Sequence, residues 1–234
     1  MGEMDLESIM SERVIVITGG HGVLGRAVVE AALADGLKVA VIDHATGQSA
    51  PEGVLELGGV DLTDPAAETR AIDAVAAQFG RLDALLNIAG GFVWQTVDAA
   101  DPAWAKMFAL NVTTALNASR AALPHLKASP EGRIVTVGAN GALKAAAGMG
   151  AYAASKAGVH RLTESLAEEL KDTPVTVNAV LPSILDTDQN RKDMPDADPA
   201  KWVRPPDLAR VMLFLASPDS RAVTGALIPV TGKV

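Results

Sequence analysis

The sequence of 234 residues contains no cysteine, which excludes disulfide bonds, thiolate metal ligands and cysteine nucleophiles. Histidine is also scarce: the four histidines are scattered, with none paired at metal-ligand spacing, so we expect no metal site. No apolar run approaches the roughly 18 residues of a membrane span. The net charge of −8 disfavours nucleic acids and anionic membranes as partners. We therefore predict a cytoplasmic protein that acts on a small molecule.

We expect no secretory signal at the N-terminus. Its residues, MGEMDLESIMSER, are acidic and contain no basic region followed by an apolar one. We predict that residues 1–11 form a disordered leader or a cloning remnant. The remaining length is sufficient for one large domain, which we assign to residues 12–234.

Short apolar runs alternate with longer helical patterns along the chain. The runs are apolar on both faces, as in strands buried in a parallel sheet. The expected strands are Arg13–Thr18, Lys38–Asp43, Gly53–Val60, Ala84–Ala89, Gly132–Gly138, Val175–Leu181 and Ala226–Val230. The expected helices are Gly25–Asp35, Pro65–Phe79, Pro102–Leu126, Gly150–Lys171 and Asp207–Leu215. This alternation predicts an α/β fold, a Rossmann-like doubly wound parallel sheet of seven strands with right-handed crossovers.

One long stretch, residues 182–204, shows no helical or strand pattern and is rich in Pro, Asp and Asn. At about twenty residues it is longer than ordinary connections in compact domains. We therefore predict a loop that covers the substrate. A disordered insertion is the alternative.

A glycine-rich segment follows the first expected strand and opens the first expected helix. The stretch IVITGGHGVLG, residues 15–25, fits G-x-G-x-x-G and T-G-x-x-G-x-x-G, whereas T-G-x-x-x-G-x-G fails at Val23. Glycines at such a turn let the backbone approach a pyrophosphate, and the helix N-terminus faces its negative charge. The predicted nucleotide-binding residues are Gly19, Gly20, His21, Gly22, Val23, Leu24 and Gly25. A glycine-rich turn without a ligand is the alternative.

An acidic residue at the end of the second strand indicates which dinucleotide binds. The carboxylate of Asp43, eighteen residues after Gly25, can accept hydrogen bonds from both ribose hydroxyls and would repel a 2′-phosphate. Because no arginine follows it, NAD(H) is favoured over NADP(H). An ordinary strand-end aspartate is the alternative. Asp61, after the third strand, either bonds the adenine amino group or begins a turn.

The only tyrosine of the chain, Tyr152, lies four residues before Lys156 in a helical pattern. This spacing places both side chains on one face of the helix. A nearby ammonium favours phenolate, so the tyrosine is a candidate general acid or base near neutral pH.

With these residues the chain resembles the short-chain dehydrogenase/reductase family over essentially its whole length. The matching segments are TGGHGVLG (18–25), DL (61–62), NIAG (87–90), NV (111–112), YAASK (152–156), LPSILDT (181–187) and VTGALIPVTG (223–232). The resemblance implies an NAD(P)-dependent oxidoreductase with strand order 3-2-1-4-5-6-7. It implies that Tyr152 exchanges a proton with the substrate, that Lys156 binds the nicotinamide ribose, and that Asn111 completes a proton relay through water.

The same resemblance supplies the other expected cofactor contacts. They are Asp61, Leu62, Asn87, Ala89 and Gly90, together with Pro182, Ile184 and Thr187 beside the nicotinamide. It also implies a homo-oligomer, a dimer or tetramer, in which the helices near 102–126 and 150–171 pair across a two-fold axis.

Two positions depart from the family pattern. The family usually has a serine thirteen residues before the tyrosine, to polarise a substrate carbonyl, but here Ala139 cannot donate a hydrogen bond. Asn140 is adjacent, although its side chain points elsewhere if the strand persists. Furthermore, NIAG replaces the commoner NNAG and removes one polar contact.

Both departures resemble the dihydropteridine reductase branch of the family. That branch is similar in its Gly-Gly-x-Gly-x-Leu-Gly loop, in AGGF (89–92), in the missing serine and in the segment VLPSILDTDQNRKDMPDAD (180–198). Because this last segment is polar, a packed core does not account for the match. The resemblance implies reduction of a quinonoid dihydropterin, which is electrophilic and needs little polarisation.

Other substrate and function assignments stay open. Trp94, Met149, Trp202 and Ala139 are candidate substrate contacts, whereas Trp104 is expected in the core or at a subunit interface and His160 in helix packing. An alcohol or ketone dehydrogenase of the same family is the first alternative to a dihydropterin reductase. A non-catalytic NAD-binding scaffold is the second, and the intact Tyr152 and Lys156 weigh against it.

Overall fold

The computed structural model describes residues 13–47 and 50–234, so the leader assigned to residues 1–11 lies outside the described residues. Its centre is a seven-stranded sheet with the order β3-β2-β1-β4-β5-β6-β7, in which all neighbours are parallel. The strands are β1 (Val14–Thr18), β2 (Lys38–Ile42), β3 (Val54–Leu57), β4 (Ala84–Asn87), β5 (Arg133–Val137), β6 (Thr176–Pro182) and β7 (Leu227–Val230). The fold class and the strand order expected from the sequence are confirmed.

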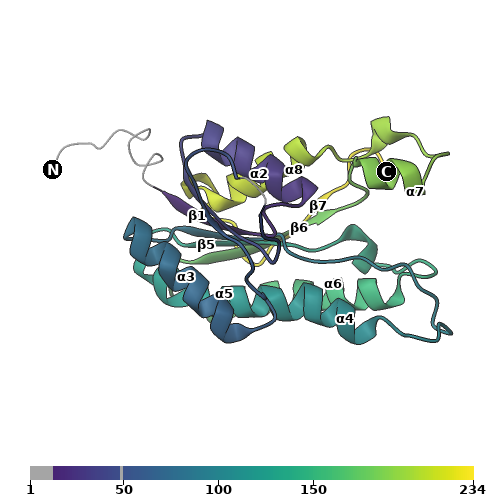
Figure 1. The fold of residues 1–234 in the computed structure, drawn as a ribbon, viewed down its shortest axis with the longest axis horizontal. Coiled ribbons are helices and arrows are strands. Elements are labelled where there is room, and N and C mark those ends of the chain that lie inside the picture. Colours follow the sequence, from purple (N-terminus) through teal and green to yellow (C-terminus); the bar gives the residue numbers. More distant parts are fainter. Residues whose placement is uncertain (1–12, 48–49) are drawn as a thin grey trace.

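Helices cover both faces of the sheet (Figure 1). Helices α2 (Val23–Ala34) and α8 (Pro205–Ala216) lie on one face. Helices α3 (Pro65–Phe79), α5 (Thr114–Ala128) and α6 (Gly150–Glu169) lie on the other, with the short α4 (Trp104–Phe108) beside α6. Successive side chains of a strand point to opposite faces, so β1 contributes Val14 and Val16 to one buried cluster and Ile15 and Ile17 to the other.

The single helix expected over Pro102–Leu126 is wrong in one respect. It is divided into α4, a π-helical turn η1 (Ala109–Thr113) and α5. Such π turns insert one extra residue into a helix and are frequent at functional sites. Asn111 lies in the middle of this turn and is 1% exposed.

The stretch 182–204 contains more regular structure than its composition indicates. It contains α7 (Asp188–Asp193) and the 3-10 turn η3 (Pro199–Lys201), and its two ends pair at the bridge Leu185–Val203. The reason is local capping: the hydroxyl of Thr187 accepts the N–H of Asn190 at 3.1 Å, and the carboxylate of Asp198 accepts that of Ala200 at 3.1 Å. Residues 182–204 therefore form a loop that contains two capped helical segments and is closed by the Leu185–Val203 bridge. Two other 3-10 turns are η2 (Asn140–Ala142) and η4 (Pro218–Ser220).

Candidate active site

The loop between β1 and α2 lets the backbone come close to a ligand. Gly19 has φ +71°, and a methyl group on Gly25 would lie 2.3 Å from the carbonyl oxygen of Gly19, so neither position accepts a side chain. The N-cap of α2, Gly22, provides no side-chain cap, and the first turn of α2 contains no acidic residue. The N–H groups at this positive end of the helix therefore suit an anion. These features fit the pyrophosphate of a dinucleotide.

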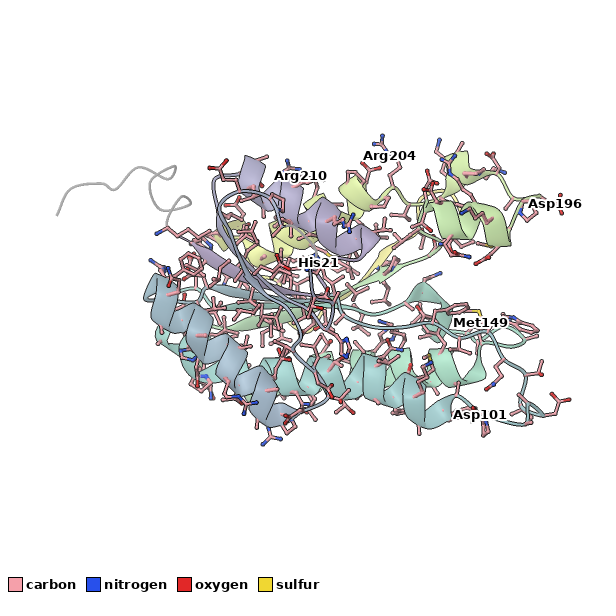
Figure 2. All side chains as sticks on the ribbon, viewed as in Figure 1. His21, Asp101, Met149, Asp196, Arg204 and Arg210 are labelled. Atoms are coloured by element: carbon pink, nitrogen blue, oxygen red, sulfur yellow. The ribbon has the colours of Figure 1, made fainter. Side chains whose placement is uncertain are left out.

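Two carboxylates contact this loop, Asp43 after β2 and Glu56 on β3. Asp43 accepts the backbone N–H of His21 at 3.1 Å through Oδ2 and that of Ala45 at 3.0 Å through Oδ1. The imidazole of His21 reaches over β2 to β3, where its Nε2 lies 3.0 Å from Oε1 of Glu56. The backbone of His21 (labelled in Figure 2) and of Ala45 thus fixes the side chain of Asp43, and the side chain of His21 pairs with Glu56.

The expected adenine side is built around the turn before α3. Oδ1 of Asp61 accepts both the N–H and the hydroxyl of Thr63, at 2.9 and 2.7 Å, and these bonds lower the pKa of the carboxyl. The carbonyl of Leu62 accepts Nδ2 of Asn117 at 3.1 Å. Asn87, 3% exposed, donates to Ser119 at 3.1 Å. Asp61 therefore does begin a turn, as one of its two sequence interpretations requires.

Tyr152 and Lys156 lie on one face of α6, toward the end of β5. Nζ of Lys156 donates to the carbonyl of Val137 at 2.7 Å, and the ammonium is 6% exposed. The ring of Tyr152 is half-buried and packs edge-on against Phe92, with 4.9 Å between ring centroids. Among the described residues, none forms a hydrogen bond with the Tyr152 hydroxyl. The phenol is therefore available to a substrate.

The expectation that the ammonium favours phenolate is wrong for this state of the site. Burial raises the pKa of the Tyr152 phenol to about 12, and burial lowers the pKa of the Lys156 ammonium to about 8. Burial accounts for both shifts, and Tyr152 is therefore protonated at neutral pH.

Asn111 connects the π turn to the Tyr152–Lys156 helix. Its amide exchanges two hydrogen bonds with the backbone of Gly91, at 2.9 and 3.1 Å, and its Nδ2 donates to the hydroxyl of Ser155 at 2.9 Å. That hydroxyl donates in turn to the carbonyl of Tyr152 at 2.7 Å. A methyl group on Gly90 would meet both Oδ1 of Asn111 and Nζ of Lys156. The three residues expected to be catalytic thus gather around one backbone segment, and Ser155 is a link that the sequence reasoning missed.

Ala139 follows β5 in extended conformation and is 3% exposed. Its side chain offers no donor, and its backbone N–H donates to Nε2 of His160 on α6 at 3.2 Å. His160 is therefore more than the packing residue that the sequence indicated.

Exposed aromatic side chains surround Tyr152. Phe92 is 57% exposed and Trp94 is 62% exposed. The Trp94 ring lies on Gly148, where an added methyl would be 2.2 Å from it, and the N–H of Gln95 bonds the carbonyl of Gly148 at 2.7 Å. Met149, labelled in Figure 2, follows at the N-cap of α6. Trp94 and Met149 thus lie at the N-terminal end of the helix that carries Tyr152, and their contact with substrate stays a prediction.

The remaining expected cofactor and substrate contacts lie in the loop 182–204. Pro182 ends β6, the carbonyl of Ile184 accepts the N–H of Val203, and Thr187 caps α7. Trp202 is only 6% exposed. It lines a separate cavity of about 480 Å³ between the loop 182–204 and the C-terminal segment, together with Arg191, Arg204 and Lys233. Trp104, expected in the core or at an interface, is 41% exposed, which excludes the core.

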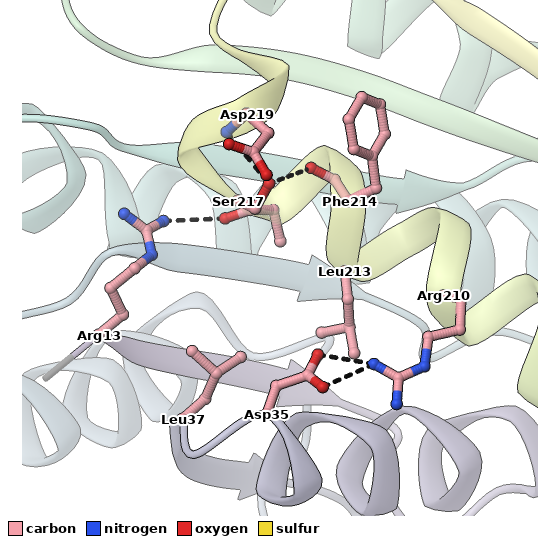
Figure 3. A pocket seen from close by; sticks show the side chains of 9 residues that line it. Arg13, Asp35, Leu37, Arg210, Leu213, Phe214, Ser217 and Asp219 are labelled. Carbon is pink, nitrogen blue, oxygen red and sulfur yellow. Dashed lines mark hydrogen bonds and ion pairs between the residues drawn. The ribbon is translucent and has the colours of Figure 1, made fainter. Parts of the chain in front are cut away.

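Three further observations concern the rest of the described chain. A second cavity, of about 240 Å³, lies at the amino ends of the strands between Arg13, Leu37 and Phe214 (Figure 3), away from Tyr152. In the described part of the chain no three His, Asp or Glu side chains gather as a metal site would require. None of the described helices combines the length and apolar character needed to cross a membrane.

Comparison with known proteins matches residues 13–198 to the short chain dehydrogenase family. The 3-oxoacyl-[acyl-carrier-protein] reductase MabA of Mycobacterium tuberculosis is 34% identical over 232 residues, which cover 94% of this chain and 92% of that protein. The ligand-free aldohexose dehydrogenase of Thermoplasma acidophilum superposes with a TM-score of 0.87 at 25% identity, covering 97% of this chain and 95% of that chain. Carveol dehydrogenase of Mycobacterium avium, solved in complex with NAD, gives 0.82 at 28% identity, covering 94% and 96%.

Proposed function

The chain belongs to the short-chain dehydrogenase/reductase family of NAD(P)-dependent oxidoreductases, and we propose that it reduces a small organic substrate with NADH, with Tyr152 as the only side-chain proton donor. One observation carries this proposal. The phenol of Tyr152 has no described hydrogen-bond partner, while the position that usually holds a second donor is Ala139. We therefore assign proton transfer to the substrate to Tyr152 alone.

The residues divide the chemistry as follows. The phosphate loop and Asp43 would hold the dinucleotide, and bound NADH supplies the hydride. Tyr152 donates its proton to the atom of the substrate that becomes O–H or N–H, and a proton from solvent restores the phenol. Lys156 would hold the nicotinamide ribose, and Asn111 with Ser155 fixes α6 against the backbone at Gly91. Because burial raises the pKa of Tyr152 to about 12, the phenol carries its proton at neutral pH, as a proton donor in a reduction must.

The preference for NADH rests on the end of β2. A 2′-phosphate beside Asp43 would meet a carboxylate whose position two backbone N–H groups fix. Like charges in close contact repel. The NAD bound to the similar carveol dehydrogenase agrees with this choice.

For the substrate we favour a quinonoid dihydropterin, on the resemblance of residues 180–198 and on Ala139. An electrophilic quinonoid ring needs no second donor, and the exposed rings of Phe92 and Trp94 can flank a planar molecule. A ketone is the second candidate, because MabA is named as a 3-oxoacyl reductase.

An assay of NADH oxidation with quinonoid dihydropterin beside a panel of ketones and quinones separates these candidates. We expect turnover of the dihydropterin, with little change in Ala139→Ser. For a ketone, the added hydroxyl should raise kcat by up to about 10²-fold, as donors to a developing oxyanion do. Absence of turnover with the whole panel under both NADH and NADPH would contradict the proposed function.

We also propose that the protein is a dimer or tetramer. Trp104 and Phe108 of α4 are each 41% exposed, and they lie against Gly150 and Gly158 of α6. Pairing of these helices with a second copy would cover both rings. Light scattering at micromolar concentration should give a multiple of the chain mass, and the mass of a single chain would exclude the oligomer. The cytoplasmic location stays a prediction.

A further inference from the structure

Helix α6 presents three side chains in a row toward the end of β5. Tyr152, Lys156 and His160 are spaced by four residues and so lie on one face of the helix. The proposed reaction uses the first two, whereas His160 is 2% exposed and has no assigned part in it.

His160 and Lys156 hold the backbone on both sides of Gly138. Nζ of Lys156 donates to the carbonyl of Val137 at 2.7 Å, and Nε2 of His160 accepts the N–H of Ala139 at 3.2 Å. The contacts have opposite polarity, one donated and one accepted by the helix. They fix the peptide that leads into Ala139.

The imidazole also occupies the space that a side chain at position 138 would need. A methyl group on Gly138 would lie 2.6 Å from Nε2 of His160 and 3.2 Å from Leu181. Buried groups packed this closely have little freedom to move independently. The ring therefore determines where the backbone of residues 138 and 139 runs.

We propose that His160 is a positioning residue of this site: as a neutral imidazole it holds the Ala139 peptide against α6 and so fixes the wall beside the proton donor. The inference rests on the proposed function only for its kinetic consequence. The geometry itself belongs to the protein without ligands.

The role requires one protonation state. Nε2 accepts a hydrogen bond only when the ring is neutral with its proton on Nδ1. A protonated ring would turn a second N–H toward the N–H of Ala139, and the contact would be lost. Burial, Arg161 and Lys156 lower the pKa of His160, while the packed strands β5 and β6 present Gly138 and Leu181, which do not titrate. Loss of the contact is thus confined to acid pH, below the ordinary value of 6.5.

The acid limb of the pH profile distinguishes His160 from Tyr152 and Lys156. Reduction uses the protonated phenol of Tyr152 and the ammonium form of Lys156, and both forms become more populated as pH falls. A fall of kcat on the acid side therefore does not arise from either group.

The test is kcat against pH at saturating NADH and substrate, for the wild type, His160→Gln and His160→Leu. The glutamine carbonyl can accept the same N–H without titrating, so this variant should keep activity and lose the acid limb. The leucine variant should lose roughly tenfold at all pH values, the scale of one hydrogen bond. His125→Gln, which removes a partly exposed histidine bonded to Asp73, is the matched control and should follow the wild type.

An acid limb that persists in His160→Gln would overturn the proposal. A second measurement does not depend on activity: ¹⁵N NMR of the His160 imidazole at pH 7 should show the proton on Nδ1. A proton on Nε2 would refute the contact even if the leucine variant fails to fold. If the wild type reduces nothing in the substrate panel, the proposed function fails, and the NMR result still decides the contact.

Discussion

The two edges of the sheet bury similar polar groups but give them different partners. At the amino ends, Asp83 is 0% exposed and accepts from the backbone of Val14, the guanidinium of Arg81 and the hydroxyl of Ser129, all within 2.9 Å. At the carboxyl ends, Lys156 bonds a single described backbone carbonyl, and the Tyr152 hydroxyl bonds no described residue.

Arginines extend the network at the amino ends. Arg13 donates to the carbonyl of Ala216 at 2.8 Å and Arg133 to that of Ser217 at 3.0 Å, which are the last carbonyls of α8. Cations at the C-terminus of a helix oppose its dipole and satisfy its free carbonyls. The carboxylate of Asp83 is thus paired within the chain, whereas the Tyr152 hydroxyl is not, so we expect the first to contribute to stability and the second to ligand chemistry. Substitutions at each edge test this division.

The largest effect on stability is expected at the amino edge. Asp83→Asn should lower the free energy of unfolding by about 3–5 kcal/mol, because it leaves buried donors without their charged partner. The value of kcat per folded molecule should not change. Denaturant unfolding with parallel kinetics measures both, and Asp35→Asn, which breaks the exposed pair with Arg210, is the matched control at about 0–1 kcal/mol.

The same residue gives the amino edge a pH dependence. Burial alone would raise the pKa of Asp83, but hydrogen bonds from Arg81, Ser129 and Val14 outweigh it and lower the pKa. A lowered carboxyl pKa stabilises the fold above its unfolded value and loses that contribution as pH falls through the folded value. Wild-type stability should therefore decline below about pH 4, and Asp83→Asn should flatten this decline. An equally steep decline in the variant would assign it to other carboxyls.

At the carboxyl edge, we expect substitutions in the loop between β1 and α2 to reduce NADH affinity more than they reduce the free energy of unfolding. In Gly25→Ala the new methyl would meet the carbonyl of Gly19 at 2.3 Å, so the loop must shift at a cost of about 1–3 kcal/mol. We expect NADH affinity to fall about tenfold or more, measured by titration. Gly36→Ala, in the turn between α2 and β2, is the control: its φ of +76° makes the substitution strained, but it lies outside the loop and should leave NADH affinity unchanged.

Glu68, in the first turn of α3, is a buried carboxyl group without a partner among the described residues, in contrast to Asp83. It is 0% exposed, neither carboxyl oxygen has a partner among the described residues, and burial raises its pKa to about 8. A raised carboxyl pKa stabilises the fold below the unfolded value and loses this contribution as pH rises toward 8. Glu68→Gln should therefore stabilise the protein at pH 8 by about 1–3 kcal/mol, and less at pH 5. Equal effects at both pH values would contradict this account.

An effect of similar size is expected on the choice between cofactors. Asp43→Ser should narrow the difference in binding free energy between NADH and NADPH by about 1–3 kcal/mol, the scale of hydrogen bonds to a charged group. Parallel titrations of both cofactors measure it. A wild type that binds NADPH as tightly as NADH would refute the assignment of Asp43 before any variant is made.

The features that depend on local sequence patterns could be predicted from the sequence. Runs apolar on both faces marked all seven strands, and the spacing of Tyr152 and Lys156 placed them on one helix face. Thr187 and Asp198 are residue types that favour helix N-caps, so the short helices in 182–204 could also have been predicted, but the high content of Pro, Asp and Asn favoured a loop. The π turn at Asn111 was not predictable, because it depends on contacts with Gly91 and Ser155 from distant segments. Nor was the raised pKa of Tyr152, since spacing gives the neighbour but not the desolvation. For His160, the continued spacing of four residues was the available signal.

The most direct test of a single proton donor at the carboxyl edge is Tyr152→Phe, assayed on the best substrate found, with NADH affinity titrated alongside. Removing the phenol deletes proton transfer but leaves the loop and Asp43 in place. We expect kcat to fall by about 10²–10⁴-fold while the Kd for NADH stays within about twofold. Wild-type turnover in this variant would contradict the account.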